Sequence, residues 1–316
     1  MTSYQTPGFD WILELFKDLR QAPTTGGRAP HKPLLILLML GRYQQNLTGD
    51  VSFAEIRQPL ADLIEEFGPA VNGRPDVVNP FWRLQNDKEG RIWRVTTGKG
   101  MRVADTVMPP PIGRLVEANA CANFAPELAR ILISESAYVA RLAGWLLATH
   151  FPASLHDDIR EAAKLIRVLS DPSPDMLDEE FTRPRDPGFR DRVLLAYEYR
   201  CAVTGWDMRL RNMTAGLEAA HIRWHVNGGP SDEPNGLALN SLHHKLFDLG
   251  AFTLSLDKVP RVMVSRLAVG GGAVKSMLLD WHGKPIQEPQ DKRWLPDPNH
   301  IQWHQQEVFK GEARAL

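Results

Sequence analysis

Apolar residues recur at helical spacing along the first part of the chain. Residues 9–20 place them at intervals of three and four, which predicts a helix buried along one side by Trp11, Ile12, Leu15, Phe16 and Leu19. A second helix is predicted to begin near His31, with Pro33 in its first turn, where a missing N–H costs no hydrogen bond. This helix is apolar nearly all round, so we expect it to be buried. A third helix is predicted over residues 53–67.

The pattern changes over residues 77–107, where apolar and polar positions alternate and Gly90 and Gly98 mark turns. Alternation of this kind predicts a β-hairpin or meander. Helices are predicted again over residues 127–149 and 155–169. The first part of the chain is therefore expected to be an α+β domain, mostly helical with a small sheet.

The C-terminal part carries shorter elements. A helix is predicted over residues 189–199, followed by a turn with Cys201 and Gly205 and a short strand that ends at His221. After a loop, a second helix is predicted over residues 235–244. Two alternating segments, AFTLSL and RVMVS, then predict strands before an irregular C-terminus.

A segment rich in proline and acidic residues, 171–187, separates these two parts and is typical of an extended, solvated linker. It predicts two domains, residues 1–170 and 188–316. The formal charge is +1 before the linker, −4 within it and +2 after it. The negative charge is therefore concentrated in the linker, and both domains are close to neutral.

Composition narrows the class of protein. The net charge of −1 over 316 residues excludes a polybasic nucleic-acid coat, although it allows a local basic groove. The two cysteines, Cys121 and Cys201, cannot form a disulfide framework, which favours a reducing cytosol. The N-terminus lacks the pattern of a signal peptide, and the longest apolar run, residues 33–41, is half of what a membrane span needs. We therefore expect a cytoplasmic protein without a membrane partner.

Candidate chemistry in the C-terminal part lies within residues 217–252. This segment holds four of the chain's 10 histidines, with asparagines and a carboxylate between and after them: His221, His225, Asn227, Asn235, Asn240, His243, His244 and Asp248. On a helix, His244 and Asp248 are four residues apart and face the same way, so they could share one cation. The alternative is that these histidines cap helices or fill a core.

The order His221, Asn235, His244, with a Gly-Gly loop between the first two, resembles the HNH nuclease motif and its ββα-metal fold. The resemblance implies that His221 is the general base, that Asn235 braces the loop that holds it, and that His244 binds a divalent cation, Mg²⁺ or Mn²⁺, together with Asp248. Ala220 stands where many members have an acidic or histidine ligand, so water, phosphate or Glu218 would complete the coordination. Cys201 lacks the second cysteine of a structural zinc site, so no such zinc is expected. His225 and His243 are expected to be structural or to face DNA.

Two segments stand out in the N-terminal part. Arg28, His31 and Lys32 precede the predicted buried helix, where cations are favoured if an anion binds beside them. Residues 74–102 hold 7 Lys and Arg against 3 Asp and Glu, with Trp82 and Trp93 between them. This local basic patch is typical of DNA contact, and equally of a solvated hairpin face.

The HKPLL run at residues 31–35 and the PFWRL run at residues 80–84 resemble the sulfur-binding domain of phosphorothioate-dependent, McrA-type HNH restriction endonucleases. The resemblance implies an apolar surface cavity that accepts a sulfur in place of a phosphate oxygen. Pro80 would line this cavity, with Arg28, His31 and Asn79 near it; Asn79 stands where the family often has tyrosine. Phe81, Trp82 and Leu84 are expected in the core. Arg83 is expected to hold a phosphate, or else to form a salt bridge at the edge of the core.

The leading hypothesis is a modification-dependent (type IV) restriction endonuclease that recognises phosphorothioated double-stranded DNA and hydrolyses phosphodiester bonds nearby. One alternative is an HNH nuclease that reads another mark, such as methylcytosine. Another is a DNA-binding module with an inactive nuclease remnant. Cutting both strands needs two active sites, so we also expect a homodimer.

Overall fold

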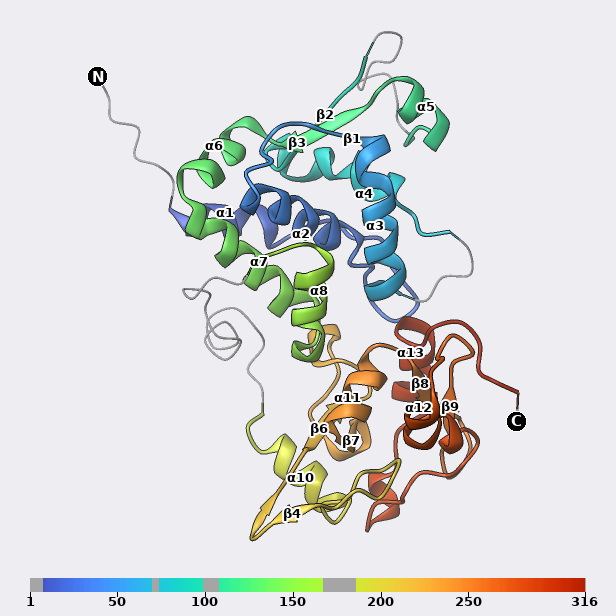
Figure 1. Ribbon diagram of the computed structural model, residues 1–316. Helices are drawn as coiled ribbons and strands as arrows, with labels where there is room; N and C mark the ends of the chain where they lie inside the picture. Colours follow the sequence, from blue (N-terminus) through green and yellow to red (C-terminus); the bar gives the residue numbers. More distant parts are fainter. Residues whose placement is uncertain (1–7, 70–73, 99–107, 167–185, 316) are drawn as a thin grey trace. The chain divides into compact units, whose positions relative to one another are not determined.

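The computed structural model describes residues 8–69, 74–98, 108–166 and 186–315 (Figure 1). These residues form two compact units. The first holds most of residues 8–166, and the second holds residues 186–315 together with Thr24–Gly27 and Phe151–Leu155. The expected linker, 171–187, lies outside the described residues except for its last two positions.

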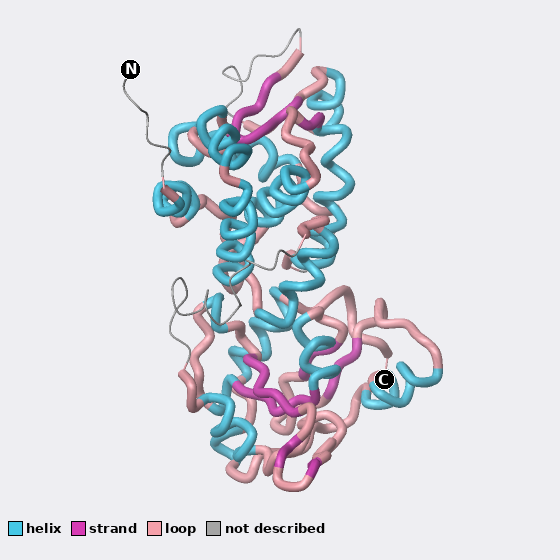
Figure 2. Tube along the Cα trace, turned by 60° about the vertical axis from the view of Figure 1, so that its left-hand side comes forward, coloured by secondary structure: helices cyan, strands magenta, loops and turns pink. Residues whose placement is uncertain are grey.

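The first unit is mainly helical, with its few strands gathered at one end (Figure 2). Its helices are α1 (Phe9–Phe16), α2 (His31–Gln44), α3 (Phe53–Phe67), α4 (Val78–Arg83), α5 (Ile112–Glu117), α6 (Pro126–Ser134), α7 (Ser136–His150) and α8 (His156–Ala162). Strands β1 (Val51–Ser52), β2 (Trp93–Thr96) and β3 (Cys121–Phe124) form an antiparallel sheet in the order β1-β3-β2. The predicted mostly helical α+β class is confirmed for this unit.

Helix α2 is the centre of the first unit, because it packs against α3, α4 and α7. Its run from Leu34 to Leu40 is buried on all sides, as the sequence predicts. The helix begins at His31 with Pro33 in its first turn, and α3 covers the predicted range. This arrangement places the first turn of α2 beside α4.

The predicted hairpin over residues 77–107 is wrong. Residues 78–83 form helix α4, residues 84–90 continue as a 3-10 segment (Leu84–Gly90), and only Trp93–Thr96 is a strand; residues 99–107 lie outside the described part. Val77, Pro80, Phe81 and Leu84 are buried and stand at positions i, i+3, i+4 and i+7, which is the spacing of one helix face. Packing of this face against α2 selects the helix.

The single helix predicted over residues 127–149 is two helices, α6 and α7. The backbone of Glu135 leaves the helical region, at φ −121° and ψ 74°, and the two helices bend by 110°. Helix α8 ends at Ala162, short of the predicted residue 169. In the described residues no single helix is long and apolar enough to cross a membrane; α6 and α7 reach that length and composition only as a bent pair.

The second unit is built on a β-hairpin followed by a helix. Strands β6 (Leu217–His221) and β7 (Gly236–Asn240) pair antiparallel, with Leu217 opposite Asn240 and His221 opposite Gly236, and α11 (Ser241–Asp248) follows directly. This is a ββα unit. The remaining elements are α10 (Phe189–Ala196), β4 (Arg209–Leu210), β5 (Met213–Thr214), β8 (Phe252–Leu254), β9 (Val262–Val264), α12 (Gly272–Met277) and α13 (Pro298–Glu307), with short 3-10 turns between them.

Two predictions for this unit are wrong. Residues 236–240 form strand β7 and not a helix, because every residue of the run GLALN is buried and pairs with β6. The helix begins only at Ser241, where the side chain of Asn240 accepts a hydrogen bond from the backbone N–H of His243. The C-terminus is also not irregular throughout, since α13 begins at Pro298 after Asp297, whose side chain caps it. The predicted strands at β8 and β9 are confirmed.

Candidate functional site

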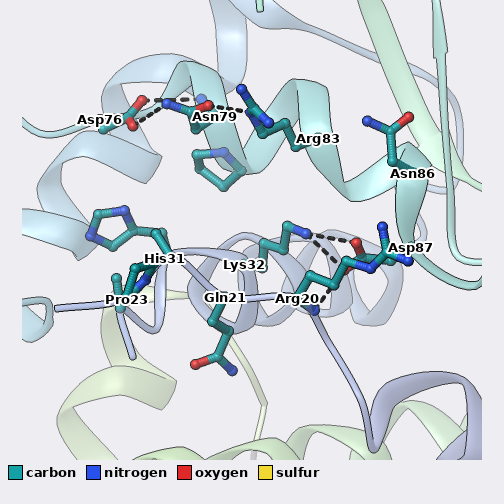
Figure 3. Close-up of a pocket in the computed structure, with 13 residues that line it drawn as sticks. Arg20, Gln21, Pro23, His31, Lys32, Asp76, Asn79, Arg83, Asn86 and Asp87 are labelled. Atoms are coloured by element: carbon teal, nitrogen blue, oxygen red, sulfur yellow. Dashed lines mark hydrogen bonds and ion pairs between the residues drawn. The ribbon is translucent and has the colours of Figure 1, made fainter. Parts of the chain in front are cut away.

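A pocket of about 440 Å³ opens in the first unit between α4 and the start of α2 (Figure 3). It brings together five of the six residues that the sequence proposed here: His31, Lys32, Asn79, Pro80 and Arg83. Arg28 is exposed and is not among the lining residues. The pocket also includes residues that sequence reasoning missed, namely Arg20, Gln21, Ala22, Pro23, Ala29, Asp76, Asn86 and Asp87.

The apolar part of the pocket is contributed by Pro80 and by three small or ring side chains, Ala22, Pro23 and Ala29. Pro80 is buried on α4 and is in the first turn of that helix, where its missing N–H leaves no gap in the hydrogen bonding. The pocket therefore presents hydrocarbon between polar side chains.

Three side chains on and before α4 are connected in series by hydrogen bonds (Figure 3). Asp76 accepts hydrogen bonds from both the backbone and the side-chain amide of Asn79. The amide oxygen of Asn79 in turn accepts a hydrogen bond from Nε of Arg83, at 2.7 Å. Asn79 therefore fixes the guanidinium of the exposed Arg83 at the pocket edge, with its terminal N–H groups left to meet an anion.

Lys32 lies on the opposite side of the pocket and is neutralised by a carboxylate. Its ammonium contacts both oxygens of Asp87, at 2.8 and 2.7 Å, and the two side chains are 10% and 2% exposed. Burial lowers the pKa of Lys32, although the contact with Asp87 works in the other direction. The charge of Lys32 is therefore already paired.

His31 differs from its neighbour. Its Nε2 is buried and has no hydrogen-bond partner among the described residues. Burial lowers the pKa of His31, against the attraction of Asp76, so the ring is neutral near pH 7. A buried polar atom without a partner is unfavourable, so Nε2 would gain from a hydrogen bond that the described residues do not supply.

The aromatic part of the expected basic patch is absent from the surface. Trp82 and Trp93 are buried, and Nε1 of Trp93 donates to the carbonyl of Phe81 at 2.9 Å. Both rings belong to the core with Phe81 and Leu84, as the sequence predicts for Phe81, Trp82 and Leu84. The interpretation of Trp93 as part of a DNA-facing basic patch is therefore wrong, because its ring is buried in the core of the first unit.

In the second unit, the ββα element positions the HNH residues. His221 ends β6 and stacks on Phe189 of α10, with ring centroids 4.0 Å apart and planes 16° apart. Its Nε2 lies 3.2 Å from the hydroxyl of Ser231, and the ring of His225 lies 5.7 Å away. The imidazole is half-buried, with one face held by an aromatic ring.

Asn235 is fully buried and holds the loop between the two strands. Its amide oxygen accepts from the N–H of Arg223 at 2.8 Å, and its nitrogen donates to the carbonyls of Arg223 and Pro230, at 3.0 and 2.7 Å. The loop can close this tightly only because Gly229 lacks a side chain: a Cβ there would lie 1.9 Å from the carbonyl oxygen of Arg223. The two residues after His221 are thus tied to the start of β7.

His244 lies between two carboxylates. Its Nδ1 is 2.6 Å from Glu218 and its Nε2 is 3.2 Å from the buried Asp248. Burial opposes the charged form, but the two carboxylates outweigh it and raise the pKa of His244 to about 10. The hydrogen bond from His244 lowers the pKa of Glu218 to about 2.

The donor chemistry of these three residues suits a divalent cation, since one imidazole and two carboxylates are ligands that Mg²⁺ and Mn²⁺ accept. They contact each other directly, however, and Asp248 also accepts from the indole of Trp224 at 2.9 Å and from Ser154. Within the described ranges no three His, Cys, Asp or Glu side chains surround a common point where a metal ion could bind.

His243 is buried and has a different surrounding from His244. Its Nε2 is 2.7 Å from the carbonyl of Met277, and its Nδ1 is 4.0 Å from the thiol of the buried Cys201. The backbone and side-chain contacts of His243 connect α11 to the core of the second unit. It therefore does not face a DNA surface.

Comparison with families of known proteins gives one match in each of the two units. Residues 10–167 match the family described as "ScoMcrA-like, DNA sulfur-binding domain", and residues 201–255 match an "HNH endonuclease" family. A comparison with curated proteins found no match.

Among solved structures, the chain is similar to the sulfur binding domain of ScoMcrA complexed with phosphorothioated DNA, at 24% identity and a TM-score of 0.40, over 48% of this chain and 94% of that one. It is also similar to the corresponding complex of SprMcrA, at 18% identity and 0.41, over 51% and 96%. A third similar structure is the type IV phosphorothioation-dependent restriction endonuclease ScoMcrA, at 25% identity and 0.40, over 53% and 34%. Because the first family match spans half of the chain, the protein belongs to the ScoMcrA-like DNA sulfur-binding domain family, here joined to an HNH endonuclease domain.

Proposed function

We propose that this protein is a phosphorothioate-dependent restriction endonuclease. The observation that supports it most is the combination, in one chain, of a sulfur-binding family domain with a pocket at Pro80 and an HNH family domain with a ββα element. The first unit would bind double-stranded DNA that carries a phosphorothioate, and the second would hydrolyse a phosphodiester bond nearby.

The chemistry of the pocket supports a sulfur ligand. Sulfur is larger and softer than oxygen and accepts hydrogen bonds more weakly, so the hydrocarbon of Pro80, Ala22 and Ala29 favours it over a phosphate oxygen. Arg83, oriented by Asn79, would contact the remaining phosphate charge, and Nε2 of His31 would find its missing partner on the DNA. Lys32 would support the pocket through Asp87, while Arg28 would meet DNA outside it.

In the second unit, His221 would accept a proton from water as the water oxygen attacks phosphorus. The bond from phosphorus to the leaving oxygen then breaks, that oxygen takes up a proton from solvent, and His221 returns the proton it accepted to solvent. Asn235 would keep the loop after His221 in place. His244 and Asp248, with Glu218, would hold a divalent cation, which when bound would stabilise the charge on the phosphate. Cutting both strands requires two such sites, which a homodimer would supply.

The test compares two duplexes of the same sequence, with and without one phosphorothioate, in Mg²⁺, Mn²⁺ or EDTA. We expect cleavage of the sulfur-containing duplex only, and only with a cation. The variant His221→Ala should abolish cleavage and keep the sulfur-dependent gel shift. Equal cleavage of both duplexes would contradict the recognition half of the proposal, and cleavage by His221→Ala would contradict the assigned base.

A second candidate function is a phosphorothioate-DNA-binding protein whose nuclease domain is inactive. The mutual contacts of Glu218, His244 and Asp248 favour it, because the donors that a cation needs are directed at each other. A sulfur-dependent gel shift with no nicking in Mg²⁺, Mn²⁺, Co²⁺ or Ni²⁺ would support this candidate.

A further inference from the structure

The β4–β5 hairpin of the second unit has an exposed apolar face. Leu210 and Met213 are paired across the two strands and are 69% and 74% exposed. Met208 stands two residues before Leu210, and its carbonyl accepts the N–H of Ala215, which extends the pairing; by the two-residue alternation of a strand it lies on the same face as Leu210. Figure 1 shows β4 at the edge of this unit. Large apolar side chains at the tip of a short hairpin have no role in the core of the unit.

The opposite face and the turn are basic. Arg209 lies over the ring of Tyr199, at 5.8 Å, and Arg211 occupies the turn with a φ of 56°. The left-handed region is unfavourable for an arginine, and asparagine or glycine is the usual choice there. Within the described part of the chain, neither arginine forms an ion pair. The tip therefore combines two arginines whose charge is not paired with a carboxylate of the described residues and two exposed apolar side chains.

The size of this face argues against a protein partner. A stable protein interface buries roughly 800 Å² on each partner and about 20–30 residues. A hairpin of two residues in each strand presents far less. One or two apolar side chains flanked by cations are instead the size of the wedges that enter between DNA base steps.

The hairpin is held close to the ββα element. Nε1 of Trp206 donates to the carbonyl of Ala215 at 3.0 Å and closes the base of the hairpin. The carbonyl of Gly216, one residue on, accepts the N–H of Ser241 at the start of α11. An extended chain spans at most about 3.6 Å per residue, so the tip lies within about 29 Å of Glu218, or roughly eight base pairs of DNA.

We propose that the β4–β5 hairpin binds the DNA beside the cleavage site, with Leu210 and Met213 against the bases and Arg209 and Arg211 on two phosphates. This inference rests on the proposed function, since it takes DNA as the substrate of the second unit. It adds a contact outside the sulfur pocket and the HNH residues, within eight base pairs of the cut.

The test uses the full chain and measures DNA affinity as a function of salt concentration. Each phosphate contact that is lost lowers the slope of log affinity against log salt by about 1. Arg209→Ala with Arg211→Ala should therefore reduce the slope by about 2. Leu210→Ala with Met213→Ala should weaken binding about ten-fold with the slope unchanged, because it removes no charge. The matched control is Leu267→Ala with Val269→Ala, which removes two equally exposed apolar side chains elsewhere in the unit and should change neither quantity.

A 2-aminopurine placed in turn at each position within eight base pairs of the cut reports unstacking. Its fluorescence should rise at one step with the wild type and not with Leu210→Ala, Met213→Ala. If all the hairpin variants bind and cleave DNA as the wild type does, the hairpin proposal alone is overturned. A wild type that binds no duplex would overturn it together with the proposed function. A change in oligomeric state on replacing Leu210 and Met213, with DNA binding unchanged, would assign the face to a second copy of the chain instead.

Discussion

The ammonium of Lys32 and the carboxylate of Asp87 form a buried ion pair across the floor of the pocket in the first unit, with both carboxylate oxygens within 2.8 Å of the nitrogen. Asp87 also accepts a hydrogen bond from the backbone N–H of Arg20, at 3.2 Å. Three segments that line the pocket are thus connected through one carboxylate. The pair ties parts of the pocket lining together and contributes no net charge to the pocket.

Removing one partner of this pair should destabilise the first unit. Asp87→Asn leaves the ammonium buried and uncompensated, and we expect a loss of about 3 kcal/mol in the free energy of unfolding, measured by urea denaturation. Replacing both residues, by Lys32→Met with Asp87→Leu, should cost less, since no charge is left buried. Glu14→Gln, which breaks the exposed pair with Lys17, is the control and should change stability by less than about 1 kcal/mol. A larger loss in the double variant than in Asp87→Asn would contradict this account.

Replacing Asn235 should loosen the loop after His221 more than it destabilises the second unit as a whole. Asn235→Ala leaves the N–H and carbonyl of Arg223 and the carbonyl of Pro230 without their partner. A fully buried group left without a partner costs about 1–3 kcal/mol, and these groups are partly buried, so each should cost less. We expect faster hydrogen exchange over residues 222–235 and a cleavage rate at least ten-fold lower, with the sulfur-dependent gel shift unchanged. Asn227→Ala, in the same loop, is a control for the general effect of a lost amide. Exchange and cleavage at wild-type rates in Asn235→Ala would show that the loop does not depend on this side chain.

We expect that one substitution affects the recognition of sulfur and that another affects the recognition of phosphate charge. Pro80→Ala removes hydrocarbon from the pocket wall, and at about 0.8 kcal/mol for each methylene we expect a roughly ten-fold loss of affinity for phosphorothioated duplex. Affinity for the unmodified duplex should stay the same. Arg83→Gln should weaken binding to both duplexes and lower the salt slope by about 1. Equal losses on both duplexes for Pro80→Ala would mean that its ring does not contact the sulfur.

The sequence predicted those features that depend on neighbours along the chain. The buried helix with Pro33 in its first turn, the helix over residues 53–67 and the strand that ends at His221 follow from local periodicity and proline geometry. His244 and Asp248 face each other because both lie on one helix at a spacing of four. These contacts require no knowledge of the rest of the fold.

Other features depend on tertiary contacts and could not be predicted. Asp87 lies in an irregular segment 55 residues from Lys32, and no local pattern indicates that the two meet. Residues 236–240 have no alternation that marks a strand, because both sides of β7 are buried. The basic residues around Trp93 in the sequence predicted that it belongs to a surface patch, but the pleat of β2 turns it inward and leaves Arg94 outside. In each case burial, which the sequence does not state, decided the outcome.

His304 should make the second unit sensitive to mild acid. The ring is fully buried against Phe247, with Nδ1 2.9 Å from the hydroxyl of Thr253 and Nε2 3.1 Å from the carbonyl of Phe247. Burial lowers the pKa of His304 to about 4, whereas an unfolded histidine titrates near 6.5. Between these values the unfolded chain binds the proton and the folded one does not, so stability is fully present above pH 6.5 and falls as the pH drops toward 4. At 1.36 kcal/mol for each pH unit, the loss is about 3 kcal/mol.

Calorimetry of the full chain from pH 7 to 4.5 should show the transition of the second unit moving to lower temperature. His304→Gln, which keeps hydrogen-bonding groups and does not titrate, should lower that transition at pH 7 and flatten its dependence on pH. An unchanged pH dependence in His304→Gln would mean that another group controls the acid sensitivity.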